Sequence, residues 1–242
     1  MSTLFSPGSQ STHPRLARYD LHLHTDFSPD SVLTPEQLVA ACRRRGLAGV
    51  AVTDHNRLGG ALALAGQALA ELQIIAGEEV MTAQGELLGL FLQEEIPAGL
   101  PADETARAIR AQGGLVGVSH PYDPWRKALQ PGALESLHQA GLLDFLEGRN
   151  GRVMWAGDNR RAEALGQRLG LPLTAGSDAH SAGEVGSCTV LLAPFSGPYE
   201  FLAALAQGRL EGHSSALARI LGRIYRTWVR RRGVPRPKEG EK

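Results

Sequence analysis

Short runs of β-branched and aliphatic residues alternate along the chain with longer segments that have helical periodicity. This alternation is typical of βα units built around a mainly parallel sheet. The pattern predicts strands at residues 18–24, 49–55, 73–82, 86–92, 115–120, 143–150, 171–178 and 188–193. It predicts helices at residues 34–46, 60–72, 101–113, 131–140 and 158–169. No internal repeat or linker divides this body, so we expect a compact barrel or an open doubly wound sheet.

Length and composition fit one ordinary folded domain. The chain has 242 residues, of which 43% are hydrophobic and 21% charged, and its two cysteines form no CxxC pattern. A disulfide framework is therefore not expected, and a reducing compartment suits the chain. The longest mainly apolar stretch, residues 59–72, is too short to span a membrane. Residues 1–17 lack the pattern of a secretory signal, so we expect a flexible N-terminus and a cytoplasmic protein.

The carboxyl-terminal segment is basic although the net charge of the chain is zero. Nine Lys and Arg residues and only two Glu residues lie between residues 216 and 242. Apolar residues recur at helical spacing between Leu217 and Val229, which predicts a basic amphipathic helix. This helix would pack on the acidic body or bind nucleic-acid phosphates or an anionic membrane surface. We therefore expect a main domain at 18–212 and a basic helical tail with a disordered end at 213–242.

Metal-binding residue types gather where the predicted strands end. They are His22, His24, Asp54, His55, Glu78, Glu79, His120, Asp178 and His180. In parallel α/β folds the carboxyl ends of the strands meet on one face, where sites are built. Two histidines separated by one residue on a strand point to the same side. Imidazole and carboxylate groups are ligands for Zn²⁺, Mn²⁺ and Fe²⁺.

Each of these pieces alone has a purely structural explanation, such as a helix cap or an ion pair. Together they would place buried polar side chains at five separate strand ends without a compensating partner, which is energetically unfavourable. The pattern therefore predicts a metal centre.

The order of the motifs resembles that of the polymerase and histidinol phosphatase (PHP) superfamily. The motifs are DLHLHTDFSPDS, VTDHN, AGEEVMT, VSHP and AGSDAH, spread over residues 18–193. The resemblance implies an α/β fold of a distorted seven-stranded (β/α), TIM-like barrel. It also implies two or three divalent ions, Mn, Zn or Fe, at the carboxyl-terminal mouth of that barrel.

The resemblance also implies a set of ligands. One ion would be bound by His22, His24 and Asp178, and Glu79 would bridge it to a second ion bound by His120. The residues matching the third-ion positions are Asp30, His55 and His180. Two departures stand out: Asp30 replaces a histidine of some members, and no histidine follows the sixth strand, where Glu147 or Asn150 would face the site instead.

By this resemblance we expect a metal-dependent phosphoesterase, either a phosphatase or a phosphodiesterase, that uses a metal-bridged hydroxide. Its substrate would be a small phosphorylated metabolite, a nucleotide or the 5′ end of a short oligonucleotide. The candidate catalytic residues are Asp54, Glu79 and Asp178, and the candidate substrate-binding residues are Arg57, Arg126 and Arg149. Asp54 would either orient an imidazole or cap the turn that follows it.

Two alternatives from other classes remain. One is a non-catalytic, metal-containing module that binds nucleic acid through the basic tail. The other is a metal-dependent amidohydrolase, although Glu79 fills the bridging position that a carboxylated lysine takes in that class. The sequence leaves open the substrate, the metal, the general acid, the oligomeric state and the role of the tail.

Overall fold

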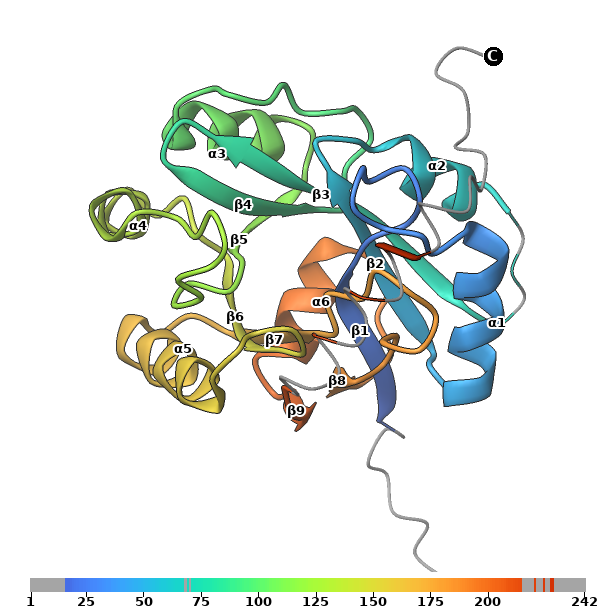
Figure 1. The fold of residues 1–242 in the computed structure, drawn as a ribbon. Helices are drawn as coiled ribbons and strands as arrows, with labels where there is room; N and C mark the ends of the chain where they lie inside the picture. Colours follow the sequence, from blue (N-terminus) through green and yellow to red (C-terminus); the bar gives the residue numbers. More distant parts are fainter. Residues whose placement is uncertain are drawn as a thin grey trace, which may run out of the picture.

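The computed structural model describes residues 16–67, 69, 71–214, 220, 224, 227 and 228. Within these residues one mixed sheet is accompanied by six helices (Figure 1). The strands are β1 (Ala17–Leu23), β2 (Gly49–His55), β3 (Gln73–Thr82), β4 (Gly85–Leu90), β5 (Leu115–Val118), β6 (Phe145–Asn150), β7 (Leu173–Gly176), β8 (Cys188–Leu192) and β9 (Arg209–Gly212). The helices are α1 (Pro35–Arg45), α2 (Gly59–Ala65), α3 (Ala102–Ala111), α4 (Pro131–Gln139), α5 (Ala156–Leu169) and α6 (Pro198–Leu205).

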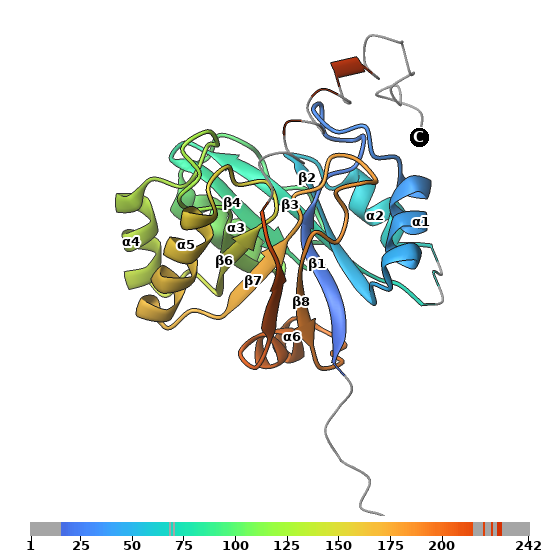
Figure 2. The ribbon, with the colours of Figure 1, turned by 60° about the horizontal axis from the view of Figure 1, so that its bottom comes forward.

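The sheet nearly closes into a barrel. Its strand order is β7-β6-β5-β4-β3-β2-β1-β8-β9, so β7 and β1 stand apart in the hydrogen-bonded order. The chain just beyond β7 nevertheless meets β1, where the backbone N–H of Asp178 donates to the carbonyl of His22 at 2.7 Å. The N–H of His24 likewise donates to the carbonyl of Ala179 at 2.9 Å. Figure 2 shows β8 beside β1. β9 pairs with the other edge of β8 and continues the sheet there.

The observed sheet differs from the expected seven-stranded barrel. The described residues form nine strands, and the sheet has four parallel and four antiparallel strand pairs. Only two residues separate β3 from β4, and so short a connection makes a hairpin rather than a parallel crossover. The sequence pattern does not predict α6 and β9, and α2 ends at Ala65 rather than at residue 72.

Two predicted segments lie mostly outside the described residues. Residues 1–15 of the expected N-terminal segment are among them. Of the expected basic helix the structure describes Ile220, Ile224, Thr227 and Trp228, all with helical backbone. Among the described residues no helix combines the length and apolar character needed to cross a bilayer.

Local sequence signals explain why α1 begins and ends where it does. The Thr34 hydroxyl accepts a hydrogen bond from the N–H of Gln37, and the Gln37 side chain accepts one from the N–H of Thr34. This reciprocal capping box satisfies two amide groups near the start of the helix. Gly46 ends the helix at φ 63°, a left-handed conformation that glycine adopts without steric cost. The chain then enters β2, which ends at the candidate site residue His55.

Gly176 permits the close approach of β7 to β1. A methyl group at this position would lie 2.3 Å from the Cβ of His22 and 2.7 Å from its backbone nitrogen. A side chain larger than hydrogen therefore requires the two strands to separate. Because His22 lies at the contact, the separation would also move a candidate ligand.

We expect Gly176→Ala to lower the free energy of unfolding by about 1 to 3 kcal/mol, because overpacking shifts the backbone. Urea denaturation measures the change. Gly132→Ala, where an added methyl group meets nothing within 4 Å, is the matched control and should leave stability within about 0.5 kcal/mol of the parent. Equal midpoints for the two variants would contradict the close packing of β7 on β1.

Candidate metal centre

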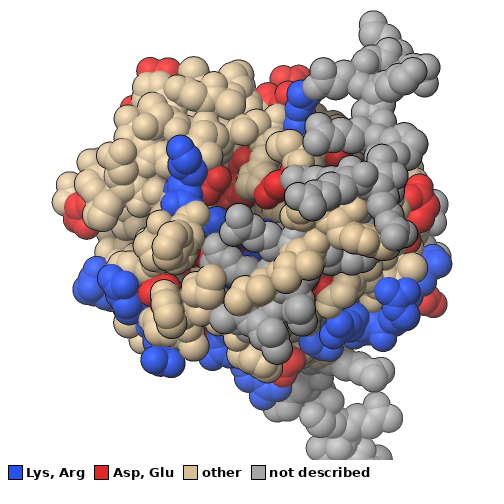
Figure 3. Space-filling model, in the orientation of Figure 1, with Lys and Arg blue, Asp and Glu red and all other residues tan. Residues whose placement is uncertain are grey.

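Nine ionisable side chains converge at one end of the barrel. They come from β1, β2, β3 and β4, from the chain just after β5 and β7, and from the loop after β1. They are His22, His24, Asp30, His55, Glu79, Glu86, His120, Asp178 and His180. Seven of the nine are buried, whereas His55 is partly exposed and the Asp30 side chain is 45% exposed. Figure 3 shows a hollow on one face of the molecule, with acidic atoms at its wall and basic atoms nearby.

Glu79 lies at the centre of the cluster. Its Oε1 is 2.9 Å from Nε2 of His120 and 3.4 Å from Nε2 of His22. Its Oε2 is 3.1 Å from Nδ1 of His55 and 3.5 Å from Nε2 of His24. One carboxylate thus contacts four imidazoles, an arrangement suited to bridging two cations.

His22 and His24 project to the same side of β1, as their spacing of two residues predicts. Their Nε2 atoms lie 3.1 Å apart, and Oδ1 of Asp178 lies 3.4 Å from Nε2 of His24. The three side chains therefore surround one point, and Glu79 completes the set.

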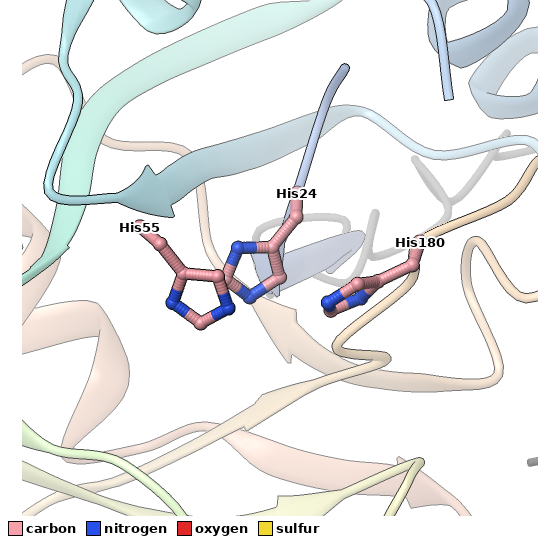
Figure 4. Close-up of side chains that lie close together, drawn as sticks. All are labelled: His24, His55 and His180. Atoms are coloured by element: carbon pink, nitrogen blue, oxygen red, sulfur yellow. The ribbon is translucent and has the colours of Figure 1, made fainter. Parts of the chain in front are cut away.

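A further group of imidazoles adjoins the first. His24, His55 and His180 come from the chain at the ends of β1, β2 and β7, and Figure 4 shows their rings close together. The ring centroids of His55 and His180 lie 4.3 Å and 4.4 Å from that of His24. Asp30 joins this group, with Oδ2 at 2.8 Å from Nε2 of His180 and Oδ1 at 3.5 Å from Nε2 of His55.

Buried hydrogen bonds orient the first two histidines. Nδ1 of His22 lies 2.9 Å from Oε1 of Glu147, and Nδ1 of His24 lies 3.3 Å from Oγ of Ser28. The Ser28 hydroxyl donates to Oδ1 of Asp54 at 2.6 Å, so toward His24 it acts as the acceptor. These partners assign a proton to both Nδ1 atoms and direct both Nε2 atoms toward each other. Two Nε2 atoms that face each other at 3.1 Å need a proton or a metal ion between them, and a metal ion would serve both rings.

Asp54 does not reach an imidazole ring directly. Its Oδ1 accepts from the N–H of Thr25 at 2.7 Å and from the Ser28 hydroxyl, and its Oδ2 accepts from the Thr25 hydroxyl at 2.6 Å. Asp54 thus holds the loop after β1 and acts on His24 through Ser28. Of the two expected roles, these contacts fit the orientation of an imidazole, reached through Ser28, rather than the capping of the turn that follows Asp54.

The two central carboxylates are held in their ionised form. Burial alone would raise the pKa of Glu79 and of Asp178. His22 beside Glu79 and Arg126 beside Asp178 instead hold both pKa values well below their usual range. Ionised carboxylates are the form that metal ligation requires.

The imidazoles differ in charge. Burial lowers the pKa of His24, and the neighbouring His55 and His180 lower it further, so His24 is neutral. Burial also acts to lower the pKa of His22, but the carboxylates of Glu147 and Glu79 raise it well above its usual value. Positive charge is therefore favoured at the His22 ring. Either a proton on the ring or a metal ion bound to it can supply this charge.

Unsatisfied buried atoms support the fit to metal ions. Among the described residues, Oε2 of Glu79, Oε2 of Glu86, Nδ1 of His120 and Oδ1 of Asp30 have no hydrogen-bond partner. Such atoms are rare in folded proteins because an unpaired buried polar group is unfavourable. These are four of the eleven such atoms among the described residues, and they lie around one set of imidazoles, where cations would be compensating partners.

Sequence comparisons place the chain in a family. Residues 156–210 match a family model described as PHP-associated. An uncharacterized protein of Methanocaldococcus jannaschii is 40% identical over 121 residues, which are 46% of this chain and 71% of the relative. A second uncharacterized protein of the same organism is 31% identical over 176 residues, covering 72% of this chain and 69% of the relative. The chain belongs to the polymerase and histidinol phosphatase (PHP) superfamily.

A solved structure shares the fold of this PHP protein. It is a two-domain protein from Bacteroides vulgatus that contains a predicted PHP-like metal-dependent phosphoesterase. The TM-score is 0.68 at 18% identity, with 90% of this chain and 75% of that chain covered. At this identity the likeness concerns the fold alone.

The arginines named from the sequence take different places in the PHP protein. Arg126 lies in the loop after β5 and forms a largely buried ion pair with Oδ2 of Asp178. Arg57 is exposed just after β2. The guanidinium of Arg149 instead donates to Oε1 of Glu163 at 2.6 Å and to the carbonyl of Leu210 at 3.2 Å. These contacts hold Arg149 away from the histidine cluster.

The two neighbouring glutamates of β3 face opposite sides of the sheet. Glu79 enters the cluster, whereas Oε2 of Glu78 accepts a hydrogen bond from the N–H of Ile96 at 3.0 Å. Burial raises the pKa of Glu78 to about 7. The two side chains thus occupy the positions expected from the alternation of a strand.

Glu86 is a site residue that the sequence motifs do not identify. It stands near the start of β4, whereas the motifs draw attention to the ends of strands. Because β4 runs antiparallel to β3, its start lies at the same edge as the ends of the parallel strands. The short connection before the strand, residues 83 and 84, is the sequence signal for this hairpin.

We expect Ser28→Ala to lower the free energy of unfolding by about 1 to 3 kcal/mol, because it removes a donor from the buried Asp54 and an acceptor from His24. The measurement is urea denaturation of the metal-free protein. Ser136→Ala is the control, since the Ser136 hydroxyl makes an exposed bond to the carbonyl of Gly132. A loss for Ser28→Ala no larger than that of the control would contradict the proposed link from Asp54 to His24.

Proposed function

We propose that this PHP protein is a metal-dependent hydrolase of phosphoesters. The observation that carries the proposal is the buried carboxylate of Glu79 among four imidazoles, with cationic Arg126 beside the same cluster at Asp178. The set contains the donors for more than one divalent ion and a guanidinium suited to phosphate oxygens. The fold it shares with the Bacteroides vulgatus protein is compatible with this activity.

The residues divide into three groups that would hold the ions. When bound, divalent ions supply positive charge for the phosphoryl oxygens and activate water at neutral pH. We propose two or three ions, with Mn, Zn and Fe as candidates from the mixture of imidazole and carboxylate donors. The groups are His22, His24 and Asp178 for the first ion, Glu79 and His120 for the second, and Asp30, His55 and His180 for the third.

The protein's own groups orient the candidate ligands. Glu147 fixes the ring of His22, and Ser28 with Asp54 fixes the ring of His24. The two Nε2 atoms therefore stay aimed at one point. A preformed arrangement of this kind lowers the cost of ordering the ligands when an ion binds.

Guanidinium groups supply positive charge beside the cluster. Arg126 and Arg152 both donate to the Asp178 carboxylate. A phosphate group that reaches this carboxylate would meet two guanidiniums in an otherwise acidic site. This charge favours a monoanionic or dianionic phosphoester over a neutral amide.

The substrate we propose is a small phosphorylated metabolite, a nucleotide or the 5′ end of a short oligonucleotide. Phosphate release is measured with chelator-treated protein supplied with Mn²⁺, Zn²⁺ or Mg²⁺. The panel contains p-nitrophenyl phosphate, histidinol phosphate, adenosine 3′,5′-bisphosphate and a short 5′-phosphorylated RNA. An amide substrate such as an N-acyl amino acid is included to test the amidohydrolase alternative.

We expect turnover that depends on added metal and falls at least about 100-fold in Asp178→Asn, because the variant loses both an anionic ligand and the partner of Arg126. Glu163→Gln, which removes the partner of Arg149 outside the cluster, is the control and should keep its activity. Absence of turnover with every metal, in folded and metal-loaded protein, would contradict the proposal. Hydrolysis of the amide alone would favour the amidohydrolase.

Glu147 offers a second test through its contact with His22. We expect Glu147→Gln to weaken metal binding by about 10- to 100-fold, because a carboxylate that holds the Nδ1 proton raises the donor strength of Nε2. Isothermal titration of the metal-free protein with Mn²⁺ gives the affinity. An unchanged affinity in the variant would show that His22 is not a ligand or needs no support.

A further inference from the structure

The carboxylate of Glu86 enters the cluster from β4. Its side chain is 6% exposed, and its Oε2 lies 3.6 Å from Nε2 of His120. Together with donors of His55 and Glu79, one oxygen of Glu86 belongs to a group of atoms that all lie within 4.8 Å of one another. Among the described residues, no donor forms a hydrogen bond to this Oε2.

A second buried carboxylate beside Glu79 is unfavourable without a cation. The groups that face the buried carboxylates of Glu79 and Glu86 are the imidazoles of His120 and His55 and the guanidinium of Arg126. A purely structural role would pair the Glu86 carboxylate with hydrogen-bond donors, as the carboxylate of Asp54 is paired with Thr25 and Ser28. Oε2 of Glu86 has no hydrogen-bond partner among the described residues and instead lies beside the donors of the second ion group.

The distances fit ligands of a common ion. Two donors bound to one ion at about 2.1 Å lie roughly 3 to 3.5 Å apart in tetrahedral or octahedral coordination. His120 Nε2 lies 2.9 Å from Oε1 of Glu79 and 3.6 Å from Oε2 of Glu86. A small adjustment of the Glu86 side chain would therefore bring all three donors onto one ion.

The other two candidates for this position are already engaged. Oε1 of Glu147 contacts His22, and its Oε2 accepts from the backbone N–H of His120 and from the side chain of Asn150. Oδ1 of Asn150 accepts from the N–H of Arg152. These side chains position ligands, and the loop between β6 and α5 contains no histidine.

We propose that Glu86 is a ligand of the ion held by His120 and Glu79, an inference that rests on the metal dependence in the proposed function. Glu86 would supply a carboxylate oxygen where an imidazole would otherwise complete the set. Two carboxylates and one imidazole form a harder donor set, which favours Mn²⁺ or Mg²⁺ over Zn²⁺ at this ion.

Metal binding tests this assignment without relying on turnover. The metal-free full chain is titrated with Mn²⁺ alone, and bound equivalents are counted by elemental analysis and by electron paramagnetic resonance of the free ion. The variants are Glu86→Gln and Glu86→His. The matched control is Glu78→Gln. Glu78 is next to Glu79 in the chain, but its carboxylate accepts a hydrogen bond from the backbone of Ile96 and does not enter the cluster. Thermal melting verifies that each variant folds.

We expect Glu86→Gln to lose about one equivalent of Mn²⁺, or to bind it about 10- to 100-fold more weakly, while Glu78→Gln keeps the parental binding. Glu86→His should regain an equivalent and shift its preference toward Zn²⁺. Parental Mn²⁺ binding in Glu86→Gln would overturn the proposal. If the glutamine variant does not fold, an unchanged preference between Mn²⁺ and Zn²⁺ in Glu86→His would overturn it.

The result also separates the two proposals. A parent protein that binds Mn²⁺, loses an equivalent in Glu86→Gln and hydrolyses none of the phosphoesters would support the role of Glu86 and contradict the phosphoesterase activity. A parent protein that binds no divalent ion would overturn both.

Discussion

The charge of Glu79 is the constraint on which the site depends. This carboxylate is fully buried, and an isolated ionised group in such surroundings would be strongly unfavourable. Contacts with His22, His24, His55 and His120 surround it, and His22, His120 and His55 lower its pKa against the effect of burial. These histidines come from three different parts of the sheet. They reach the Glu79 carboxylate only because β1, β2 and the chain after β5 meet around β3. The same arrangement places several donors where cations can be bound.

The near closure of the sheet brings a further candidate ligand, Asp178, to this carboxylate. The backbone of Asp178 and Ala179 bonds to that of His22 and His24, so the carboxylate of Asp178 lies next to the imidazoles of β1. Asp178 has a φ of 53° and His120 a φ of 26°, both unusual for residues other than glycine. Strained backbone of this kind persists where the surrounding structure holds it, and here it occurs at two residues of the cluster.

Support for the cluster extends one contact beyond the candidate ligands. Glu147 contacts His22, and Ser28 contacts His24. Such contacts choose which ring nitrogen carries the proton, and so determine which nitrogen can bind a cation. Basic groups also belong to the site, because Arg126 pairs with one of the central carboxylates. The site thus combines a surplus of anionic and imidazole donors with a few guanidiniums, which suits metal ions together with an anionic substrate.

Local properties of the chain are enough to predict most helices and strands, the family resemblance and the candidate ligands at the strand ends, because periodicity and short motifs involve only neighbouring residues. The choice of Glu79 rather than Glu78 as the candidate ligand came only from the family resemblance. Contacts between distant segments decided the rest. The hairpin of β3 and β4 brought Glu86 into the cluster, and Glu163 drew Arg149 away from it. The short connection indicates that β4 is antiparallel to β3, but residue type and spacing do not show which of its side chains reaches the cluster or which partner a charged side chain takes. Both are set by packing of the whole sheet.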